Sequence, residues 1–320
     1  MAIEIHFLIP YVEAELKKKN ISLDLSKGVQ ELGAGRYSKT YLVESSDGKL
    51  VIHLVGSHNP DIQFKQAEKR FEISQFLKKH PKVPTAEMIT YGEVEGTVFT
   101  VQEYIAGKIW AEKKANLKHL QHLAKILAYL HQINLKGSGY LQFKEGKPEG
   151  THEDWYLFLK PWVMSSLKNI YEYVQIKKLT DSISEKKYLY LKNKLELFFE
   201  KYKDYFMGVK GKLLHGDLAL GNIILGGKKV NALIDLDFSC SGDPAWEFAL
   251  RDHLHEKCLD YYFAELKKIG LELDEDQFRF RIKLYVPLLR IIITNSLKSG
   301  RHKNIKKDLY IFEKMIDELL

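Results

Sequence analysis

The sequence contains few of the features that hold a protein in a membrane or stabilise it outside the cell. It has two cysteines, Cys240 and Cys258, which show neither the spacing of a metal site nor a framework of disulfide pairs. The chain does not begin with a basic stretch followed by a long apolar core, and apolar runs such as LLRIII are too short to cross a bilayer. We therefore expect a cytoplasmic protein with reduced cysteines and no membrane partner.

A surplus of acidic residues is also absent, since the formal net charge is +7. Such a balance favours anionic ligands, and both nucleic acids and nucleoside triphosphates are anionic. The lysines are scattered and are not gathered with aromatic residues into one stripe, which argues against nucleic acid. With 320 residues, 45% apolar and 28% charged, the chain suits two folded lobes or one large domain with subdomains.

The first third of the chain has the pattern of a small sheet with helices. Helical spacing covers residues 8–19, and turn-rich breaks divide residues 28–56 into three strands. A charged amphipathic helix at 61–79 precedes two further strands. These elements predict an N-terminal lobe over residues 1–105, built from a five-stranded antiparallel sheet and one long helix.

The remainder, residues 106–320, has a mainly helical pattern. A strongly amphipathic helix comes before a loop at 136–150. Long helical patterns follow at 152–174 and 181–206, and helices resume at Pro244. The predicted fold class is α+β, with a small β-rich N-terminal lobe and a larger helical C-terminal lobe.

Between the helical blocks lies the segment LLHGDLALGNIIL, which starts at Leu213 and leads into VNALIDLDF. Phosphoryl transfer needs a carboxylate that takes the proton of an acceptor hydroxyl, and oxygen ligands for a divalent cation that bridges the donor phosphates. Asp217 matches the first requirement, and Asn222 and Asp235 match the second. The alternative is that Asp217 and Asn222 only shape a turn and Asp235 ends a strand.

The segments HGDLALGNIIL and ALIDLDFSCSGDPAWEFA resemble the signature of the aminoglycoside phosphotransferase and choline kinase group of the protein-kinase-like fold. The insert GSGYLQFKEGKPEGTHEDWYLFL, earlier in the chain, is similar to that of hygromycin-phosphotransferase-like antibiotic kinases. Relative to the protein-kinase pattern, Gly216 replaces an Arg and DLD replaces D-F-G. The resemblance implies a bilobal kinase that uses Mg²⁺ and ATP or GTP to phosphorylate a hydroxyl of a small molecule, as a monomer or a dimer.

The resemblance also implies nucleotide-binding residues in the N-terminal lobe. The turn LGAGRYS places Gly33, Gly35 and Ser38 beside the phosphates, although a plain hairpin explains the same stretch. The strap between the lobes offers the main chain of Glu103 and its neighbours Tyr104 and Ile105 to a purine ring. Main-chain contacts of this kind do not distinguish ATP from GTP.

One position departs from the family pattern. His53 stands where the family has a Lys or Arg, and the expected partner of that cation is Glu72, or else Glu68. A neighbouring Glu72 would raise the pKa of His53. Otherwise Lys49 or Lys65 supplies the charge, or phosphate anchoring is weak.

Further residues are expected around the catalytic loop and the acceptor. The supporting set is His215, Asp237 and Asp243, although Asp243 also makes an ordinary helix N-cap. The possible acceptor contacts are Glu247, Asp154 and Trp155, with helix-end stabilisation or core packing as the alternatives. The group phosphorylates aminoglycosides, choline, ethanolamine, homoserine, methylthioribose and ketosamine sugars, and the sequence leaves this choice open.

Two other classes of protein compete with the small-molecule kinase. A nucleotide-binding pseudokinase that acts as an interaction module would explain His53, but it would not need Asp217 as a base. A protein kinase is disfavoured because Gly216 replaces the Arg that pairs with a phosphorylated activation loop.

Overall fold

The computed structural model describes residues 5–34, 38–56, 59–110, 116–179, 183–249, 256–297 and 304–320. The chain divides into two compact units. The first comprises Met1–Tyr129, Gln142–Pro148 and Gly216–Phe238, and the second comprises Leu130–Leu141, Glu149–His215 and Ser239–Leu320. The segment with Asp217, Asn222 and Asp235 thus belongs to the first unit, although the chain on either side of it belongs to the second. The two lobes divided near residue 105 stay a prediction.

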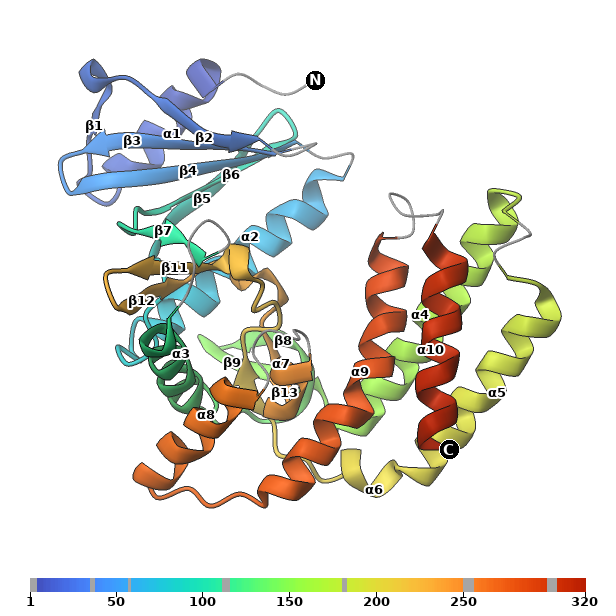
Figure 1. Ribbon diagram of the computed structural model, residues 1–320. Coiled ribbons are helices and arrows are strands. Elements are labelled where there is room, and N and C mark those ends of the chain that lie inside the picture. The colour runs from blue at the N-terminus through green and yellow to red at the C-terminus, as the bar shows by residue number, and fades with distance from the viewer. Residues whose placement is uncertain are drawn as a thin grey trace. The chain divides into compact units, whose positions relative to one another are not determined.

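A six-stranded antiparallel sheet dominates the first unit (Figure 1). Its strands are β1 (Leu23–Asp24), β2 (Gln30–Ala34), β3 (Ser38–Ser45), β4 (Gly48–Gly56), β5 (Met88–Val94) and β6 (Thr97–Glu103). The spatial order is β1-β3-β4-β6-β5, and β2 pairs with β3. The five expected strands are present, and the two-residue β1 adds a sixth.

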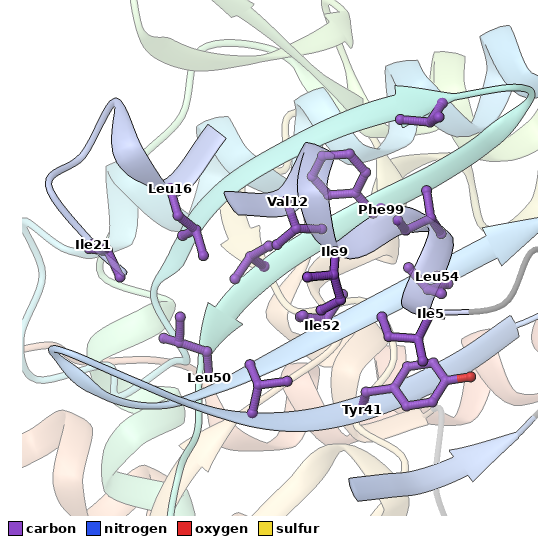
Figure 2. Packing of buried hydrophobic residues seen from close by; sticks show 14 residues of the cluster. Ile5, Ile9, Val12, Leu16, Ile21, Tyr41, Leu50, Ile52, Leu54 and Phe99 are labelled. Atoms are coloured by element: carbon purple, nitrogen blue, oxygen red, sulfur yellow. The ribbon is translucent and has the colours of Figure 1, made fainter. Parts of the chain in front are cut away.

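Helix α1 (Ile5–Lys17) covers one face of this sheet. Its buried residues recur at helical spacing from Ile5 to Leu16, and they pack against strand residues that include Ile52 and Phe99 (Figure 2). Successive residues of a strand point to opposite faces. His53, next to Ile52 in β4, therefore lies on the face that α1 does not cover.

Helix α2 (Pro60–Leu77) contacts that other face. Its N-cap is Asn59, whose side chain accepts a hydrogen bond from the main-chain N–H of Ile62 at 3.3 Å. Ala67 of α2 packs with Met88 and Val98 of the sheet, and Val98 alternates with the α1-facing Phe99. Helix α2 and His53 consequently share one side of the sheet.

A second, three-stranded sheet in the first unit carries the candidate catalytic segment. It contains β7 (Lys108–Ile109), β11 (Ile223–Gly226) and β12 (Lys229–Leu233), in the order β12-β11-β7. Short 3₁₀ turns flank the hairpin, η3 (Leu220–Asn222) before it and η4 (Leu236–Phe238) after it. Helix α3 (Leu117–Leu130) contacts this sheet, since His119 Nε2 lies 3.1 Å from the carbonyl oxygen of Gly227.

The second unit combines a small sheet with most of the helices. The strands, in spatial order, are β10 (Lys212–Leu214), β13 (Cys240–Gly242), β8 (Ser138–Lys144) and β9 (Lys147–His152), and the β8–β9 tip, Gln142–Pro148, is grouped with the first unit. Its helices are α4 (Trp155–Ile176), α5 (Glu185–Lys201), α6 (Lys203–Phe206), α7 (Pro244–Ala249), α8 (Glu256–Lys268), α9 (Glu275–Leu297) and α10 (Ile305–Leu319). Helices α4, α5, α9 and α10 run side by side (Figure 1).

The α+β class with an N-terminal antiparallel sheet and a helical C-terminal part is confirmed. The prediction of a loop at 136–150 is wrong, because this stretch contains most of the β8–β9 hairpin. Its turn residues Glu145 and Gly146 have φ values of 51° and 71°, and two consecutive positive values suit a tight hairpin turn. No helix among the described residues combines the length and the hydropathy needed to cross a bilayer.

Candidate active site

The start of the catalytic loop is anchored by a buried carboxylate in the second unit. The main-chain N–H of His215 donates a hydrogen bond to Oε2 of Glu247 at 2.9 Å, and Glu247 is completely buried. His131 lies nearby, with Nε2 at 3.9 Å from the same carboxylate oxygen and Nδ1 at 3.0 Å from the hydroxyl oxygen of Tyr262. Glu247 therefore holds the backbone from which the loop departs.

Gly216 allows the loop to approach the η4 turn closely. Its φ is +81°, and a Cβ atom built on it would lie 2.0 Å from the carbonyl oxygen of Phe238. A side chain there would need both a left-handed backbone and a displaced neighbour. The glycine that replaces the protein-kinase Arg thus has a steric role of its own.

Asp217 and Asn222 are joined through the loop between them. Nδ2 of Asn222 donates to the main-chain oxygen of Asp217 at 2.9 Å and to its Oδ2 at 3.1 Å. The main-chain N–H of Ile234 donates to the main-chain oxygen of Asn222 at 2.9 Å, which attaches the loop to the end of β12. Because Nδ2 faces Asp217, Oδ1 of Asn222 is turned the other way.

Asp235 follows β12 with an unusual backbone. Its φ is +63°, in the left-handed region that residues with a Cβ seldom adopt. Such strain persists only where the surroundings enforce it, and it is frequent at functional sites. Here it lies where the chain leaves β12 for η4, between Ile234, which is bonded to Asn222, and Asp237, which is bonded to α2.

The clamp between Asp237 and α2 is an ion pair with Arg70. Nε and Nη2 of Arg70 lie 2.5 Å from Oδ1 and Oδ2 of Asp237, and both side chains are largely buried. The adjacent Lys69 donates from Nζ to the main-chain oxygen of Asp237 at 3.1 Å. Two cations of α2 thus hold the turn that follows Asp235.

These residues line a cavity of about 400 Å³. The sheet contributes Ser38, Thr40, Val51, His53, Met88 and Gln102, the catalytic segment contributes Asn222, Leu233, Ile234, Asp235, Leu236 and Asp237, and the remaining lining residues are Arg70, Ser74 and Ala86. The expected metal ligands and four polar sheet residues therefore face one space. Asp217 is linked to that space through Asn222.

A second cavity of about 400 Å³ shares part of this lining. Val51, Gln102 and Ile234 border both cavities, and other walls of the second are largely apolar. The strap residues Glu103, Tyr104 and Ile105 line it together with Gly33, Gly107, Ile109 and Ile224. An apolar slot that continues into a polar, acid-bearing space has the division expected for a nucleotide, with a purine in one part and phosphates in the other.

The sequence matches the phosphotransferase enzyme family over residues 28–250, which is well over half of the chain. The chain belongs to the phosphotransferase enzyme family. A search among curated proteins finds no match.

Solved structures of other phosphotransferases share this fold. One is a thermostable mutant of aminoglycoside phosphotransferase APH(4)-Ia in a ternary complex with AMP-PNP and hygromycin B, at 15% identity and a TM-score of 0.66, covering 96% of this chain and 98% of that one. A protein of Haemophilus somnus 129PT assigned as a fructosamine-3-kinase has 13% identity and a TM-score of 0.67, covering 97% and 96%. Macrolide 2'-phosphotransferase MphH of Brachybacterium faecium has 13% identity and a TM-score of 0.56, covering 93% and 97%.

The cation arrangement of this family member differs from the expected one. Burial and the positive charge of Arg70 lower the pKa of His53 from 6.5 to about 4, so the expectation of a raised pKa is wrong. Nδ1 of His53 lies 2.9 Å from the hydroxyl oxygen of Thr40. The cavity lining that the structure describes includes Arg70 but neither Glu72 nor Glu68.

The reason is which side of α2 faces the sheet. Arg70 lies on the same helical stripe as Ala67 and Ser74, which are buried against the sheet. A residue two positions away points roughly 200° around the helix, so Glu72 faces away from the cavity. Arg70 was missed because its charge suggested an exposed position, although its spacing from Ala67 and Ser74 was a usable signal.

Two candidate acceptor contacts in the second unit are buried. Trp155 is completely buried, and its Nε1 donates to the hydroxyl of Tyr285 at 2.9 Å, so core packing explains it. Glu247 is occupied by the main chain of His215, as described above. Neither residue presents a polar surface to an acceptor, and both assignments are corrected to structural roles.

The other two candidate residues of the second unit, Asp154 and Asp243, each cap the N-terminus of a helix. Asp154 caps α4 by accepting from the main-chain N–H of Tyr156 at 2.7 Å, and it also accepts from Gly208 at 2.8 Å. Asp243 accepts from Ala245 at 3.0 Å as the N-cap of α7, and its other oxygen is bonded to Arg281 and Tyr285. Asp154 also borders an open hollow with Glu153 and Lys210, and it stays a candidate acceptor contact.

Within the Gly-rich turn, the structure places only part of the predicted set. Gly33 lines the purine-sized cavity, and a Cβ there would meet no atom within 4 Å. Ser38 lines the acid-bearing cavity. Gly35 lies outside the described residues.

The donor set in the acid-bearing cavity fits a magnesium ion. Magnesium prefers oxygen ligands and is commonly held by one or two protein side chains together with phosphates and water. The Asn222 Oδ1 and the Asp235 carboxylate are ligands of this kind, and both residues line the cavity. Among the described residues, no cluster of three His, Cys, Asp or Glu side chains would hold a metal ion.

Proposed function

We propose that this phosphotransferase is a magnesium-dependent kinase that moves the γ-phosphoryl group of ATP or GTP to a hydroxyl of a small molecule. The observation that carries the proposal is the contact of Asn222 with Asp217, combined with the shared cavity of Asn222 and Asp235. This arrangement supports the assignment of Asp217 as the base and of Asn222 and Asp235 as the metal ligands. The purine would lie against Glu103–Ile105 and Gly33, and the phosphates near Ser38.

Each catalytic side chain has a definite task in this reaction. The acceptor oxygen forms a bond to the γ-phosphorus while the bond from that phosphorus to the β–γ bridging oxygen breaks, and the nucleoside diphosphate leaves. Asp217 accepts the hydroxyl proton. The hydrogen bond from Asn222 fixes the orientation of that carboxylate. A magnesium ion held by Asn222 and Asp235 would neutralise charge on the donor phosphates.

The acceptor class is proposed more broadly. Relatives of the same fold include an enzyme solved with hygromycin B and a protein assigned as a fructosamine-3-kinase, so an aminoglycoside-like compound and a ketosamine, choline or homoserine type of metabolite are both candidates. The net charge of +7 is unfavourable for a polycationic acceptor. We place the acceptor in the lobe predicted at residues 106–320 and the nucleotide mainly in that at 1–105.

The main alternative is a pseudokinase that binds nucleotide without transfer. Its argument was the loss of a cation at His53. The cavity nevertheless contains a cation, Arg70, and Asp217 is held in place by Asn222. A module that only binds nucleotide does not need an oriented base, so these contacts favour the kinase.

A thermal-shift titration tests the proposal. The native protein, Asp235→Ala and the control Asp276→Ala, an exposed residue of the first turn of α9, are each titrated with ATP or GTP with and without Mg²⁺. Binding to the folded state raises the melting temperature. We expect a magnesium-dependent rise that Asp235→Ala abolishes and Asp276→Ala retains.

An acceptor screen follows on the native protein, with nucleoside diphosphate release and the mass of the phosphorylated product as readouts. Aminoglycosides come first and ketosamines second. A melting temperature that neither nucleotide moves at millimolar concentration would refute the kinase. Nucleotide binding without product from any acceptor class would favour the binding module.

A further inference from the structure

A cavity that receives triphosphate oxygens needs positive charge besides a metal ion. Kinases of this fold usually place that charge on a Lys of a central strand, paired with a Glu of the helix packed beside it. In this chain the strand position is His53 and the inward position of the helix is Arg70. The chain thus has a His in place of the strand Lys and an Arg in place of the helix Glu.

Arg70 is the only Lys or Arg among the described residues that line the acid-bearing cavity. The alternative cations suggested by the sequence lie elsewhere. Lys49 pairs with Glu44 at 3.3 Å and borders a different hollow, and Lys65 is exposed on α2. His53 is largely neutral near pH 7, because burial and Arg70 lower its pKa to about 4.

The guanidinium of Arg70 is held so that one edge is committed. Nε and Nη2 each approach one oxygen of Asp237 at 2.5 Å, a paired geometry that fixes the plane of the group. A guanidinium has five N–H donors, and this pair uses two of them. The remaining donors, on Nη1 and Nη2, match the spacing of two phosphate oxygens.

From this geometry we propose that Arg70, clamped by Asp237, is the side chain that binds the phosphates of the nucleotide in place of a strand-borne Lys. This inference rests on the proposed function and goes further by assigning the phosphate contact to α2. Asp237 then has the part that the helix Glu has in other kinases, as the anion that positions the cation. His53 contributes a neutral hydrogen-bonding group beside Thr40.

The test compares a nucleoside diphosphate with its nucleoside, because only the former carries phosphates. Dissociation constants for ADP and adenosine are measured by calorimetry, in EDTA and in Mg²⁺, with GDP and guanosine if GTP is the donor. We expect Arg70→Gln to weaken ADP binding at least tenfold and to leave adenosine binding within twofold. Arg70→Lys, which keeps the charge but loses the paired geometry, retains part of the preference for ADP.

Two variants separate phosphate binding from a purely structural clamp. Asp237→Asn breaks the ion pair but keeps the cation, so it retains the preference for ADP over adenosine. Introducing His53→Lys into Arg70→Gln returns a cation to the strand and restores the preference. The control Arg290→Gln breaks a similar half-buried pair, Arg290 with Asp308 at 3.1 Å in the second unit, and leaves both constants unchanged.

Equal losses of ADP and adenosine binding in Arg70→Gln would overturn the inference, because a structural clamp affects both ligands. ADP and adenosine dissociation constants that both stay at their native values in that variant would overturn it as well. These results differ from failure of the proposed function, in which the native protein either binds neither ligand or binds the nucleotide without transferring a phosphoryl group.

Discussion

Replacement of Gly216 by alanine is expected to strain the catalytic loop in two ways. The backbone there has φ +81°, which costs a residue with a Cβ roughly 1–2 kcal/mol. The new Cβ would also lie 2.0 Å from the carbonyl oxygen of Phe238, well inside contact distance. Because that neighbour is main chain, it cannot rotate away, and the overlap adds roughly 1–3 kcal/mol.

Gly227 provides the matched control for this substitution. It also has a left-handed backbone, with φ +57°, but a Cβ there would meet no atom within 4 Å. Gly227→Ala is therefore expected to cost only the backbone part, roughly 1–2 kcal/mol. The difference between the two variants isolates the close approach of the loop to η4.

Equilibrium urea unfolding measures both variants against the native protein. We expect the free energy of unfolding to fall by about 3 kcal/mol for Gly216→Ala and by less than about 2 kcal/mol for Gly227→Ala. The folded fraction of Gly216→Ala should also have a lower kcat, because Asp217 is the next residue. Equal losses of stability in the two variants would refute the steric role of Gly216.

Three further outcomes are expected. Asp217→Asn should lower kcat by about 10²–10⁴-fold while the nucleotide-induced rise in melting temperature remains, which a coupled assay and a thermal shift check together. The pKa of His53 is 6.5 in the unfolded chain and about 4 in the folded one, so the unfolded chain binds more protons between these pH values. The contribution of neutral His53 to the free energy of unfolding is therefore complete above pH 6.5, and it falls by up to about 3 kcal/mol as the pH approaches 4. In His53→Gln the urea midpoint should depend less on pH across that range than in the native protein. An unchanged pH dependence would show that His53 is not its cause. Tyr285→Phe removes the hydroxyl that donates to Asp243 at 2.7 Å and should cost roughly 1–3 kcal/mol in calorimetric unfolding, with nucleotide binding unaltered.

The sequence was sufficient for features that depend on local spacing. Asp217 and Asn222 are five positions apart in one loop, so their contact needs only a tight turn, and the structure shows it. The apolar alternation of β4 and the helical spacing of α1 likewise follow from neighbouring residues.

Features that depend on packing were harder to infer. Helix α2 has polar residues all around it, so its sequence indicates only weakly, through the spacing of Ala67, Arg70 and Ser74, which side faces the sheet. For this reason Glu72 was expected beside the strand-borne cation and Arg70 was not considered, whereas the described cavity lining includes Arg70 and not Glu72. The sequence also left Glu247 and Trp155 as possible acceptor contacts. Whether an acid or an indole is buried depends on partners distant in sequence, here His215 and Tyr285, and the sequence does not reveal those partners.

The β8–β9 hairpin shows a different limit. Its stretch is rich in Gly and Lys and contains Pro148, a composition typical of loops. The pairing of β8 with β13 supplies the main-chain hydrogen bonds that the local sequence does not predict. Tertiary context decides the conformation of such a segment.

The ion pair between Arg70 and Asp237 joins residues 167 positions apart, and this separation has a consequence for synthesis. While a ribosome is still adding the helices between them, the first sheet and α2 are already made but lack their acidic partner. Closing so long a loop is a slow, late event in folding. A nascent or truncated chain that ends before Asp235 therefore lacks both the acidic partner of Arg70 and Asp235, one of the two proposed metal ligands. On the proposed function, the metal and nucleotide site is complete only after the ribosome has made almost three quarters of the chain.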